Sequence, residues 1–289
     1  MKNRAAAYMA VLRAIASNLP PDKRKFEDPY AKLFLPPSLK LVEWLSRSVT
    51  LNKIISWYIE KRWTGALTSC IARTKLIDNM LTNLVQREGV NQVIIFGAQY
   101  DCRVHRLKLK EAPMFVEVDD PQKQERKRQI LENSTINPKT QMTYLPVNFH
   151  KQHLDDVLPG LFHSRHYKTL FIWEGVSNYF TAPVASKIFK YFKTFPSGTT
   201  IIFNYVDEEV LYHPDAFPGA SNVSKLLQQN NEFWNFGIDP DKLEEFLAAY
   251  NLKLIHHADA NRYRKMYFGE SAEKMKGYEF YRVVMAVVK

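Results

Sequence analysis

The chain has 289 residues, of which 46% are hydrophobic, enough for one large domain or two small ones with a full core. Its two cysteines, Cys70 and Cys102, are too few for a disulfide framework and lack the spacing of a metal site, so we expect no metal and a cytoplasmic, reducing location. No apolar run reaches the length of a membrane span, and charges interrupt the amino terminus too often for a secretory signal.

The formal net charge is +10. The cations are dispersed, with small clusters at 23–25, 126–128 and 262–265, and this favours an ordinary solvated surface. A sharper interpretation is that the positive field attracts an acidic substrate or partner. Because no nucleic-acid-binding module accompanies the charge, we expect no nucleic acid as a partner. Because no apolar run is long enough to span a bilayer, we expect no membrane partner either, and no protein partner is indicated.

Residues 1–65 have a helical pattern that prolines at 20, 21, 29, 36 and 37 divide into short helices. This segment is rich in aromatic residues: Tyr8, Phe26, Tyr30, Trp44, Trp57, Tyr58 and Trp63. Two interpretations are open, an edge of the helical core or a lid over a ligand site. A longer helix is predicted at 68–87, where apolar residues recur at helical spacing.

From residue 92 the pattern alternates between strand and helix. The predicted strands are 92–97, 114–119, 142–147, 168–174 and 199–205, and the predicted helices are 120–133, 150–158 and 182–194. Such alternation predicts a mostly parallel sheet with helices on both faces.

The segment 206–235 contains Pro214 and Pro218 and is predicted to be an irregular insertion on the substrate side. A helix follows at 239–250. Two closing strands at 252–258 and 279–288 have no long helix predicted between them, which suggests a hairpin with one antiparallel strand. We therefore predict a single domain over residues 1–289.

A candidate ligand site lies where the first two strands end. The apolar strand Val93 to Phe96 runs into a turn at Gly97 and Ala98, and ligands of open α/β sheets bind at such carboxyl ends. The second strand ends in Asp119, and an acid at this position typically takes the two hydroxyls of a ribose. The pair predicts half of a site for an adenosine-containing ligand. The alternative is an ordinary strand-to-helix turn, because Gln99 stands where a dinucleotide fingerprint has its second glycine.

Several ordered motifs extend this pattern along most of the chain. They are Arg13-Ala14 with Asp28-Pro29-Tyr30-Ala31, Ile71-Ala72-Arg73-Thr74 with Asp78, GAQYDCR at 97–103, Glu117-Val118-Asp119, Asn148-Phe149, Glu174-Gly175-Val176 and Phe236-Gly237-Ile238. In these motifs the chain resembles the leucine carboxyl methyltransferase family of class I S-adenosylmethionine-dependent methyltransferases, especially its bacterial small-molecule members. The resemblance implies an α/β, Rossmann-like, seven-stranded mixed sheet with helices on both faces and residues 1–65 as a helical lid.

The resemblance also implies roles at the adenosine end of S-adenosylmethionine. Asp119 would hold the ribose hydroxyls, with Glu117 as the fallback. Asn148 would meet the adenine amino group, and Phe149 would lie against the ring. Asn148 replaces the family's usual aspartate, and an asparagine carbonyl still accepts a hydrogen bond, although without charge.

At the methionine end, Arg73 would bind the cofactor carboxylate, and Gly97 and Ala98 would let the backbone approach. Glu174 would lie under the amino group. Gln99 replaces a glycine of the family motif, so its side chain either points away or contacts the ligand. Alternatively, Arg73 forms only a surface ion pair with Asp78. The loop residues Asp101 and Arg103 are expected to brace the turn rather than touch the cofactor.

Four residues that follow the fourth and fifth strands are candidates for the acceptor pocket: Asn178, Tyr179, Asn204 and Tyr205. Methyl transfer is accelerated mainly by positioning, and a carboxylate acceptor needs no general base, whereas a hydroxyl does. The predicted function is methylation of a carboxylate or hydroxyl of a small molecule. Two alternatives stay open: a cyclase that consumes S-adenosylmethionine itself, with Gln99 and Asn178 holding its amine, and a non-catalytic binding module. His256 and His257 are expected to end a strand in solvent.

Overall fold

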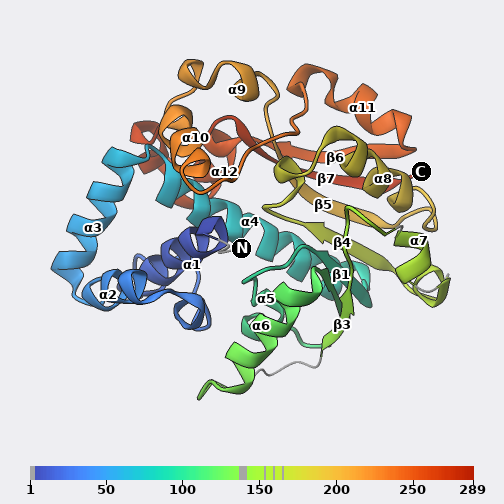
Figure 1. Cartoon of the computed structure of the whole chain (residues 1–289), viewed down its shortest axis with the longest axis horizontal. Coiled ribbons are helices and arrows are strands. Elements are labelled where there is room, and N and C mark those ends of the chain that lie inside the picture. Colours follow the sequence, from blue (N-terminus) through green and yellow to red (C-terminus); the bar gives the residue numbers. More distant parts are fainter. Residues whose placement is uncertain (1–3, 137–141, 153, 159, 165) are drawn as a thin grey trace.

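A seven-stranded sheet forms the centre of the computed structural model, which describes residues 4–136, 142–152, 154–158, 160–164 and 166–289 (Figure 1). The strands are β1 (Gln92–Phe96), β2 (Met114–Asp119), β3 (Met142–Pro146), β4 (Thr169–Trp173), β5 (Thr200–Val206), β6 (Leu252–Ala258) and β7 (Tyr281–Val288). Their order in the sheet is β3-β2-β1-β4-β5-β7-β6. The predicted seven-stranded mixed sheet is confirmed.

Strands β1 to β5 are parallel, and β1 lies in the middle with Ile94 paired to Val116 of β2 and to Phe171 of β4. Every residue of β1, β4 and β5 is buried, which explains why these strands consist mostly of apolar residues instead of alternating apolar and polar ones. The last strand, β7, is antiparallel to both β5 and β6, as the closing pair predicted.

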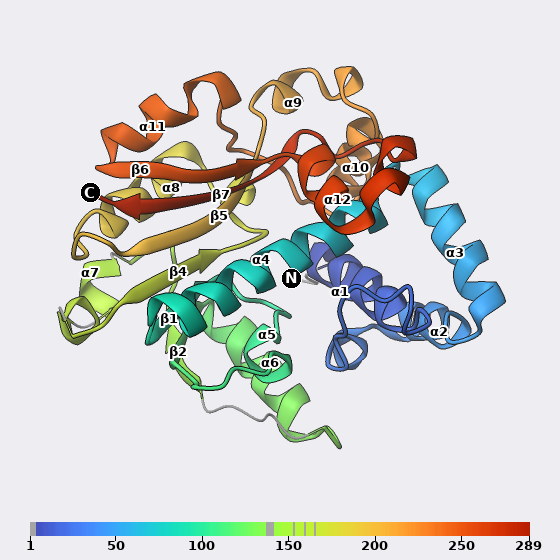
Figure 2. The ribbon, with the colours of Figure 1, turned by 180° about the vertical axis from the view of Figure 1, so that it is seen from behind.

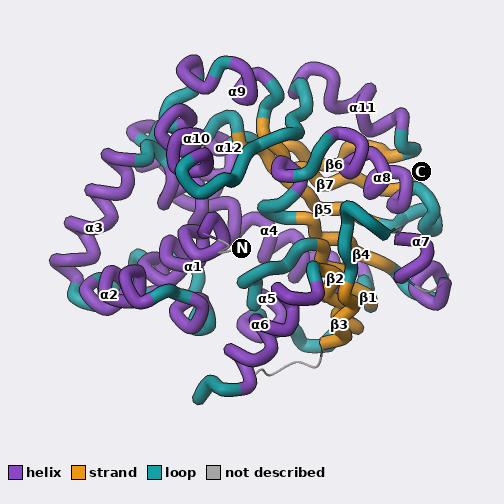
Figure 3. The backbone as a smooth tube through the Cα atoms, viewed as in Figure 1, coloured by secondary structure: helices purple, strands orange, loops and turns teal. Residues whose placement is uncertain are grey.

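Helices cover both faces of the sheet (Figures 2 and 3). One hydrophobic cluster joins the sheet to α1 (Arg4–Ser17), α4 (Ala66–Glu88), α5 (Arg103–Arg106), α6 (Pro121–Glu132), α10 (Ala220–Gln228) and α12 (Ala260–Phe268). A second cluster on the other face contains side chains of α7 (Leu154–Val157), α8 (Ala182–Phe192) and α11 (Leu243–Ala249). The other α-helices of the described residues are α2 (Pro37–Leu45), α3 (Val49–Arg62) and α9 (Glu209–Tyr212). Within the described residues no helix is long and apolar enough to cross a bilayer.

The structure differs from the sequence-based prediction in three helices. The helix expected at 150–158 shrinks to α7, because Asn148 starts a turn in which its side chain accepts from the backbone N–H of His150. A helix, α12, stands between the two closing strands, capped by Asp259, whose carboxylate accepts from the N–H of Arg262. The segment 206–235, expected to be irregular, contains α10, which buries Val223 and Leu227.

Within the predicted lid, α1 and the α2–α3 pair have different surroundings. Helix α1 is deeply buried: Ala10 and Ile15 are 0% exposed and belong to the same cluster as the apolar side of α4. By contrast, Trp44 on α2 and Trp57 on α3 are 59% and 60% exposed. Only part of the aromatic segment therefore packs over the sheet, and α3 lies at the rim of the molecule in both views (Figures 1 and 2).

Three segments meet at a junction of glycines near the end of α3. A Cβ on Gly277 would lie 2.1 Å from the carbonyl oxygen of Thr64, and a Cβ on Gly219 would lie 2.5 Å from the same oxygen. A Cβ on Gly65 would lie 2.5 Å from the carbonyl oxygen of Lys276. All three glycines also have positive φ, between 84° and 89°. The backbone therefore ties the end of the predicted lid to α10 and to the segment that precedes β7, at a distance that no side chain permits.

We predict that Gly277→Ala lowers the free energy of unfolding by about 3 kcal/mol or more, because the added methyl group meets rigid backbone and the conformation is left-handed. Gly89→Ala is the matched control. Its φ is 71°, but nothing lies within 4 Å of the new Cβ, so the substitution should cost only about 1 kcal/mol. Urea denaturation of both variants measures the difference, and equal costs would contradict the junction.

Candidate functional site

The carboxyl ends of β1 and β2 are tied together by the carboxylate of Asp119. Its two oxygens accept from the backbone N–H groups of Gln99, at 2.8 Å, and of Asp120, at 2.7 Å. Asp119 is 2% exposed, and burial raises the pKa of its carboxyl. Gln99 has a φ of 46°, so it occupies the left-handed conformation that suits the glycine usual at this point. The turn after β1 is thus held against the end of β2.

Gly97 is required by its surroundings. Its φ is 62°, and a Cβ there would lie 2.7 Å from a methyl group of Val176. Its backbone N–H donates to the carbonyl oxygen of Val118. The turn therefore fits between the ends of β2 and β4, and the 7% exposed Ala98 continues it.

Glu117 contacts a buried lysine rather than the open end of the sheet. Lys127 of α6 is 0% exposed, and its Nζ lies 2.5 Å from Glu117 and 2.6 Å from the carbonyl oxygen of Asp101. Burial acts to lower the pKa of Lys127, but the surrounding acidic groups together, with Glu117 foremost, outweigh burial and raise that pKa. Glu117 is therefore the anchor of α6, which leaves Asp119 as the acid at the strand end.

Arg73 and Glu174 meet across the site. The Arg73 Nε donates to Glu174 at 3.1 Å, and its guanidinium lies 4.7 Å from the ring centroid of Tyr281. Arg73 is 5% exposed, so the alternative of a surface pair with Asp78 is wrong. On its outer edge the guanidinium contacts the sulfur of Met9, at 3.8 Å. Because a thioether is a weak acceptor, this edge is the part of Arg73 that remains able to bind an oxyanion.

Glu174 also accepts from Arg103, which in turn pairs with Asp101 at 2.8 Å. Burial acts to raise the pKa of Glu174, but Arg103 and Arg73 outweigh it and hold that pKa below its usual range. In the same way Arg103, Arg106 and Lys127 lower the pKa of Asp101 to about 2. The expected bracing role of Asp101 and Arg103 is consistent with these contacts.

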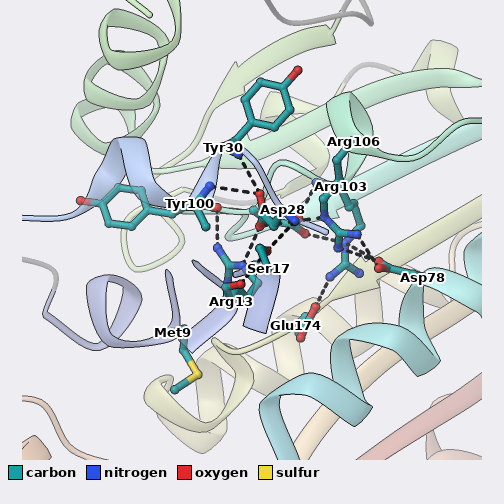
Figure 4. Close-up of polar contacts among 12 residues, drawn as sticks. Met9, Arg13, Ser17, Asp28, Tyr30, Asp78, Tyr100, Arg103, Arg106 and Glu174 are labelled. Atoms are coloured by element: carbon teal, nitrogen blue, oxygen red, sulfur yellow. Dashed lines mark hydrogen bonds and ion pairs between the residues drawn. The ribbon is translucent and has the colours of Figure 1, made fainter. Parts of the chain in front are cut away.

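The ion pairs continue beneath the loop (Figure 4). Asp78 binds Arg106 with both oxygens, at 2.5 and 2.8 Å. Asp28 accepts from Arg13 of α1, and Arg13 also donates to the carbonyl oxygen of Tyr100 in the loop after β1. Side chains from α1, α4 and this loop therefore converge on one buried set of charges, which fixes α1 next to the strand ends.

Asn148 and Phe149 follow β3. The Asn148 side chain accepts from His150, and its backbone N–H donates to Gln152. The Phe149 ring lies 5.9 Å from the ring of Phe96 and 5.4 Å from that of Phe180. The aromatic ring that follows β3 thus packs beside the ends of β1 and β4.

Asn178 has an unusual environment. It is 0% exposed, yet neither its amide nitrogen nor its amide oxygen has a hydrogen-bond partner among the described residues. A buried amide without partners is costly, and it typically marks a position where a ligand or water completes the bonding. Close to it in the chain, Gly175 has a φ of 78° and nothing within 4 Å of where a Cβ would stand, and its N–H donates to Asn204.

The two tyrosines of the predicted acceptor pocket differ. Burial raises the pKa of Tyr179, which packs beside Trp234 and Tyr281. Tyr205 is directed to the opposite face of the sheet from its neighbour Val206, and its hydroxyl lies 3.0 Å from His257. The structure therefore does not bring Tyr205 to the other candidates. It also corrects the expectation for His257, which is half-buried rather than at the end of a solvated strand.

The matching family model is leucine carboxyl methyltransferase, over residues 6–193. The chain belongs to this family of S-adenosylmethionine-dependent methyltransferases. A candidate S-adenosyl-L-methionine-dependent methyltransferase of Bacillus subtilis, YktD, is 24% identical over 242 residues, which cover 82% of this chain and 77% of that protein. A similarly described protein of Frankia alni is 26% identical over 44% of each chain.

The fold is shared with solved structures. A protein of the DUF574 family from Streptomyces avermitilis superimposes with a TM-score of 0.56 and 12% identity, covering 96% of this chain and 97% of its own. A candidate methyltransferase from Thermobifida fusca gives a TM-score of 0.53, also at 12% identity, over 86% of this chain and 93% of its own. These likenesses confirm the class I methyltransferase fold that the motifs predicted.

Sequence reasoning misses two residues of this family member's site. Lys127 lies in the polar run QKQERKRQ, where nothing distinguishes the one buried cation from its solvated neighbours. Arg106 lies just after the GAQYDCR motif, and it binds Asp78, which the sequence suggested as a partner of Arg73. The spacing of Asp78 five residues after Arg73 on one helix is the misleading signal. Among the described residues, no group of three or more potential metal ligands is present.

We predict that Lys127→Met destabilises the fold by about 3–5 kcal/mol, because Glu117 is left buried without a counter-charge. The double variant Glu117→Leu/Lys127→Met should recover a large part of this loss, since no lone charge remains. Chemical denaturation of the two single variants and the double variant gives the coupling energy. Additive losses would show that the pair does not act as a unit.

The stability that Asp101 contributes to the fold should depend on pH. Because the pKa of Asp101 is about 2 in the folded state, below the usual 3.8, its contribution to stability is present above about pH 4 and is lost as the pH falls towards 2. The difference in unfolding free energy between wild type and Asp101→Asn should therefore be about 2 kcal/mol near neutral pH and shrink through this window. A difference that stays constant between about pH 2 and pH 6 would contradict the ion pairing.

Proposed function

We propose that this family member transfers the methyl group of S-adenosylmethionine to the carboxylate of a small acidic molecule. S-adenosylmethionine supplies an electrophilic methyl group on a sulfonium. In the proposal, the protein contributes binding, orientation and exclusion of water, which account for most of the acceleration of a methyl transfer.

The residues at the strand ends fit this cofactor. Asp119 keeps lone pairs for ribose hydroxyls, because each of its oxygens accepts one backbone hydrogen bond from the described residues and a carboxylate oxygen can accept a second. The outer edge of Arg73 suits the carboxylate of the methionine part, and the anionic Glu174 suits its ammonium group. The amide of Asn178, without partners among the described residues, offers a further donor and acceptor. The ring of Phe149 supplies an aromatic wall for the adenine.

One observation favours a carboxylate acceptor over a hydroxyl. The titratable groups after β4 are poor bases: Glu174 is an anion whose pKa is held below its usual range by two guanidiniums, and the pKa of Tyr179 is raised by burial. A hydroxyl acceptor needs a base to take its proton, whereas a carboxylate arrives ionised. The net positive charge of the chain also favours an acidic substrate.

Turnover with matched acceptors tests the proposal. Purified protein is incubated with S-adenosylmethionine and a panel of small carboxylic acids, each paired with the alcohol of the same skeleton, and products are identified by mass spectrometry. We expect S-adenosylhomocysteine and a methyl ester with at least one acid, and no ether from the paired alcohol. Methylthioadenosine formed without any acceptor would instead show that the cofactor itself is the substrate and would overturn the proposal.

Cofactor binding tests the role of Arg73 separately from turnover. Arg73→Lys keeps the positive charge but loses the planar fork, so affinity for S-adenosylhomocysteine should fall by about tenfold or more in calorimetry. The matched control is Arg87→Lys, an exposed arginine in the last turn of the same helix, which should leave affinity unchanged. If both variants bind as tightly as wild type, Arg73 serves only to hold Glu174.

A further inference from the structure

The outer surface of α2 and α3 carries most of the exposed large hydrophobic side chains in the described part of the chain. Eleven such side chains are exposed, and seven of them lie within residues 41–58. These seven, which we call the outer face, are Leu41, Trp44, Val49, Leu51, Ile54, Trp57 and Tyr58. A concentration of this kind on an otherwise ordinary surface marks an interaction site.

The orientation of α3 is fixed, so the outer face does not turn inward. Asn52, on the inner side of the helix, is 1% exposed and donates to the carbonyl oxygens of Ile15 and Ser46. Ile59, two turns later on the same side, is 8% exposed. Trp57 and Tyr58 therefore point to solvent because the opposite side of the helix is anchored to α1 and α2.

The charge around the outer face is positive. Lys53 and Lys61 are exposed beside it, and the Lys61 Nζ lies 5.0 Å from the ring centroid of Trp57. The two acids of these helices are already engaged. Glu43 binds Arg47 and Asn18. Glu60 accepts from the backbone N–H groups of Gly65 and Thr68.

A cavity of about 690 Å³ borders the outer face, and Trp44 is part of both. Three cations line this cavity, Lys32, Lys40 and Arg47, together with Glu43, the partner of Arg47. Neutral groups of α6 and the turn after it form the far wall. Trp44 thus has the apolar side chains of the outer face on one side and the positively charged cavity on the other.

We propose that the outer face binds the surface of an anionic phospholipid bilayer. Exposed tryptophan and aliphatic side chains with lysines alongside are the composition of helices that lie in a membrane interface. The basic cavity fits anionic headgroups next to Trp44. A second copy of the chain fits less well, because two such faces are both positive and each chain carries a net charge of +10. The expectation of no membrane partner rested on the lack of a spanning segment, which surface binding does not need.

Co-sedimentation with vesicles tests this surface on the full-length protein. We expect binding to vesicles of phosphatidylcholine mixed with phosphatidylserine, little binding to phosphatidylcholine alone, and a loss of binding as salt is raised. Trp57→Ala should weaken binding about tenfold, and Lys53→Gln/Lys61→Gln on the order of tenfold or more. A blue shift of tryptophan fluorescence on mixed vesicles should shrink in Trp57→Ala.

Matched variants away from the face are the controls. Tyr212→Ala removes an aromatic side chain that is 73% exposed on α9, and Lys225→Gln/Lys253→Gln removes two exposed lysines elsewhere. Both should bind as wild type, and melting temperatures should show that all variants are folded. The proposal is overturned if wild type ignores the mixed vesicles at low salt, if the face variants and the controls bind equally, or if sedimentation velocity shows a dimer that Trp57→Ala dissociates.

Discussion

The buried chain of alternating charges beneath the loop after β1 is the interaction on which the rest of the site depends. Four arginines and four carboxylates take part: Arg13, Arg73, Arg103 and Arg106 with Asp28, Asp78, Asp101 and Glu174. Burying any one of these charges without a partner would cost several kcal/mol of desolvation free energy. The opposite charges offset this penalty only when each carboxylate lies within reach of its arginine. The network therefore selects a geometry more than it adds stability, and it connects α1, α4, the loop and the end of β4.

This geometry fixes both the end of β4 and the position of α1. Glu174 stays ionised and in place because Arg73 and Arg103 both hold it, so the strand end offers a fixed anion rather than a proton acceptor. Arg13 brings α1 against the loop through the carbonyl oxygen of Tyr100. Helices α2 and α3 have no part in these charges, which leaves their apolar outer face to solvent or to a partner.

Much of the fold is predictable from the sequence because parallel strands buried on both faces read as apolar runs, as 93–96 does. The position of β7 between β5 and β6 is not, since its antiparallel pairing leaves no mark on its own residues. Helix α12 escapes prediction because its run NRYRKM is mostly polar, although it buries Tyr263 and Arg264.

The site is predictable only where a motif and a strand end coincide, as at Gly97 and Asp119. The partner of Arg73 lies 101 residues away, and Lys127 is one basic residue among many in its helix until the fold buries it beside Glu117. Likewise, Tyr205 and Asn204 are neighbours in the chain, but the alternation of a strand sends their side chains to opposite faces. Such pairings are decided by tertiary packing, which local patterns do not encode.

We infer that this charge network presents a preformed binding site at the ends of β1, β2 and β4. A crystal structure of the complex with S-adenosylhomocysteine tests it most directly. In this complex the ribose should lie on Asp119 and the methionine carboxylate on the outer edge of Arg73, and Glu174 should still be paired with both Arg73 and Arg103. A ligand bound elsewhere, or bound here only after Glu174 has left its two arginines, would contradict it.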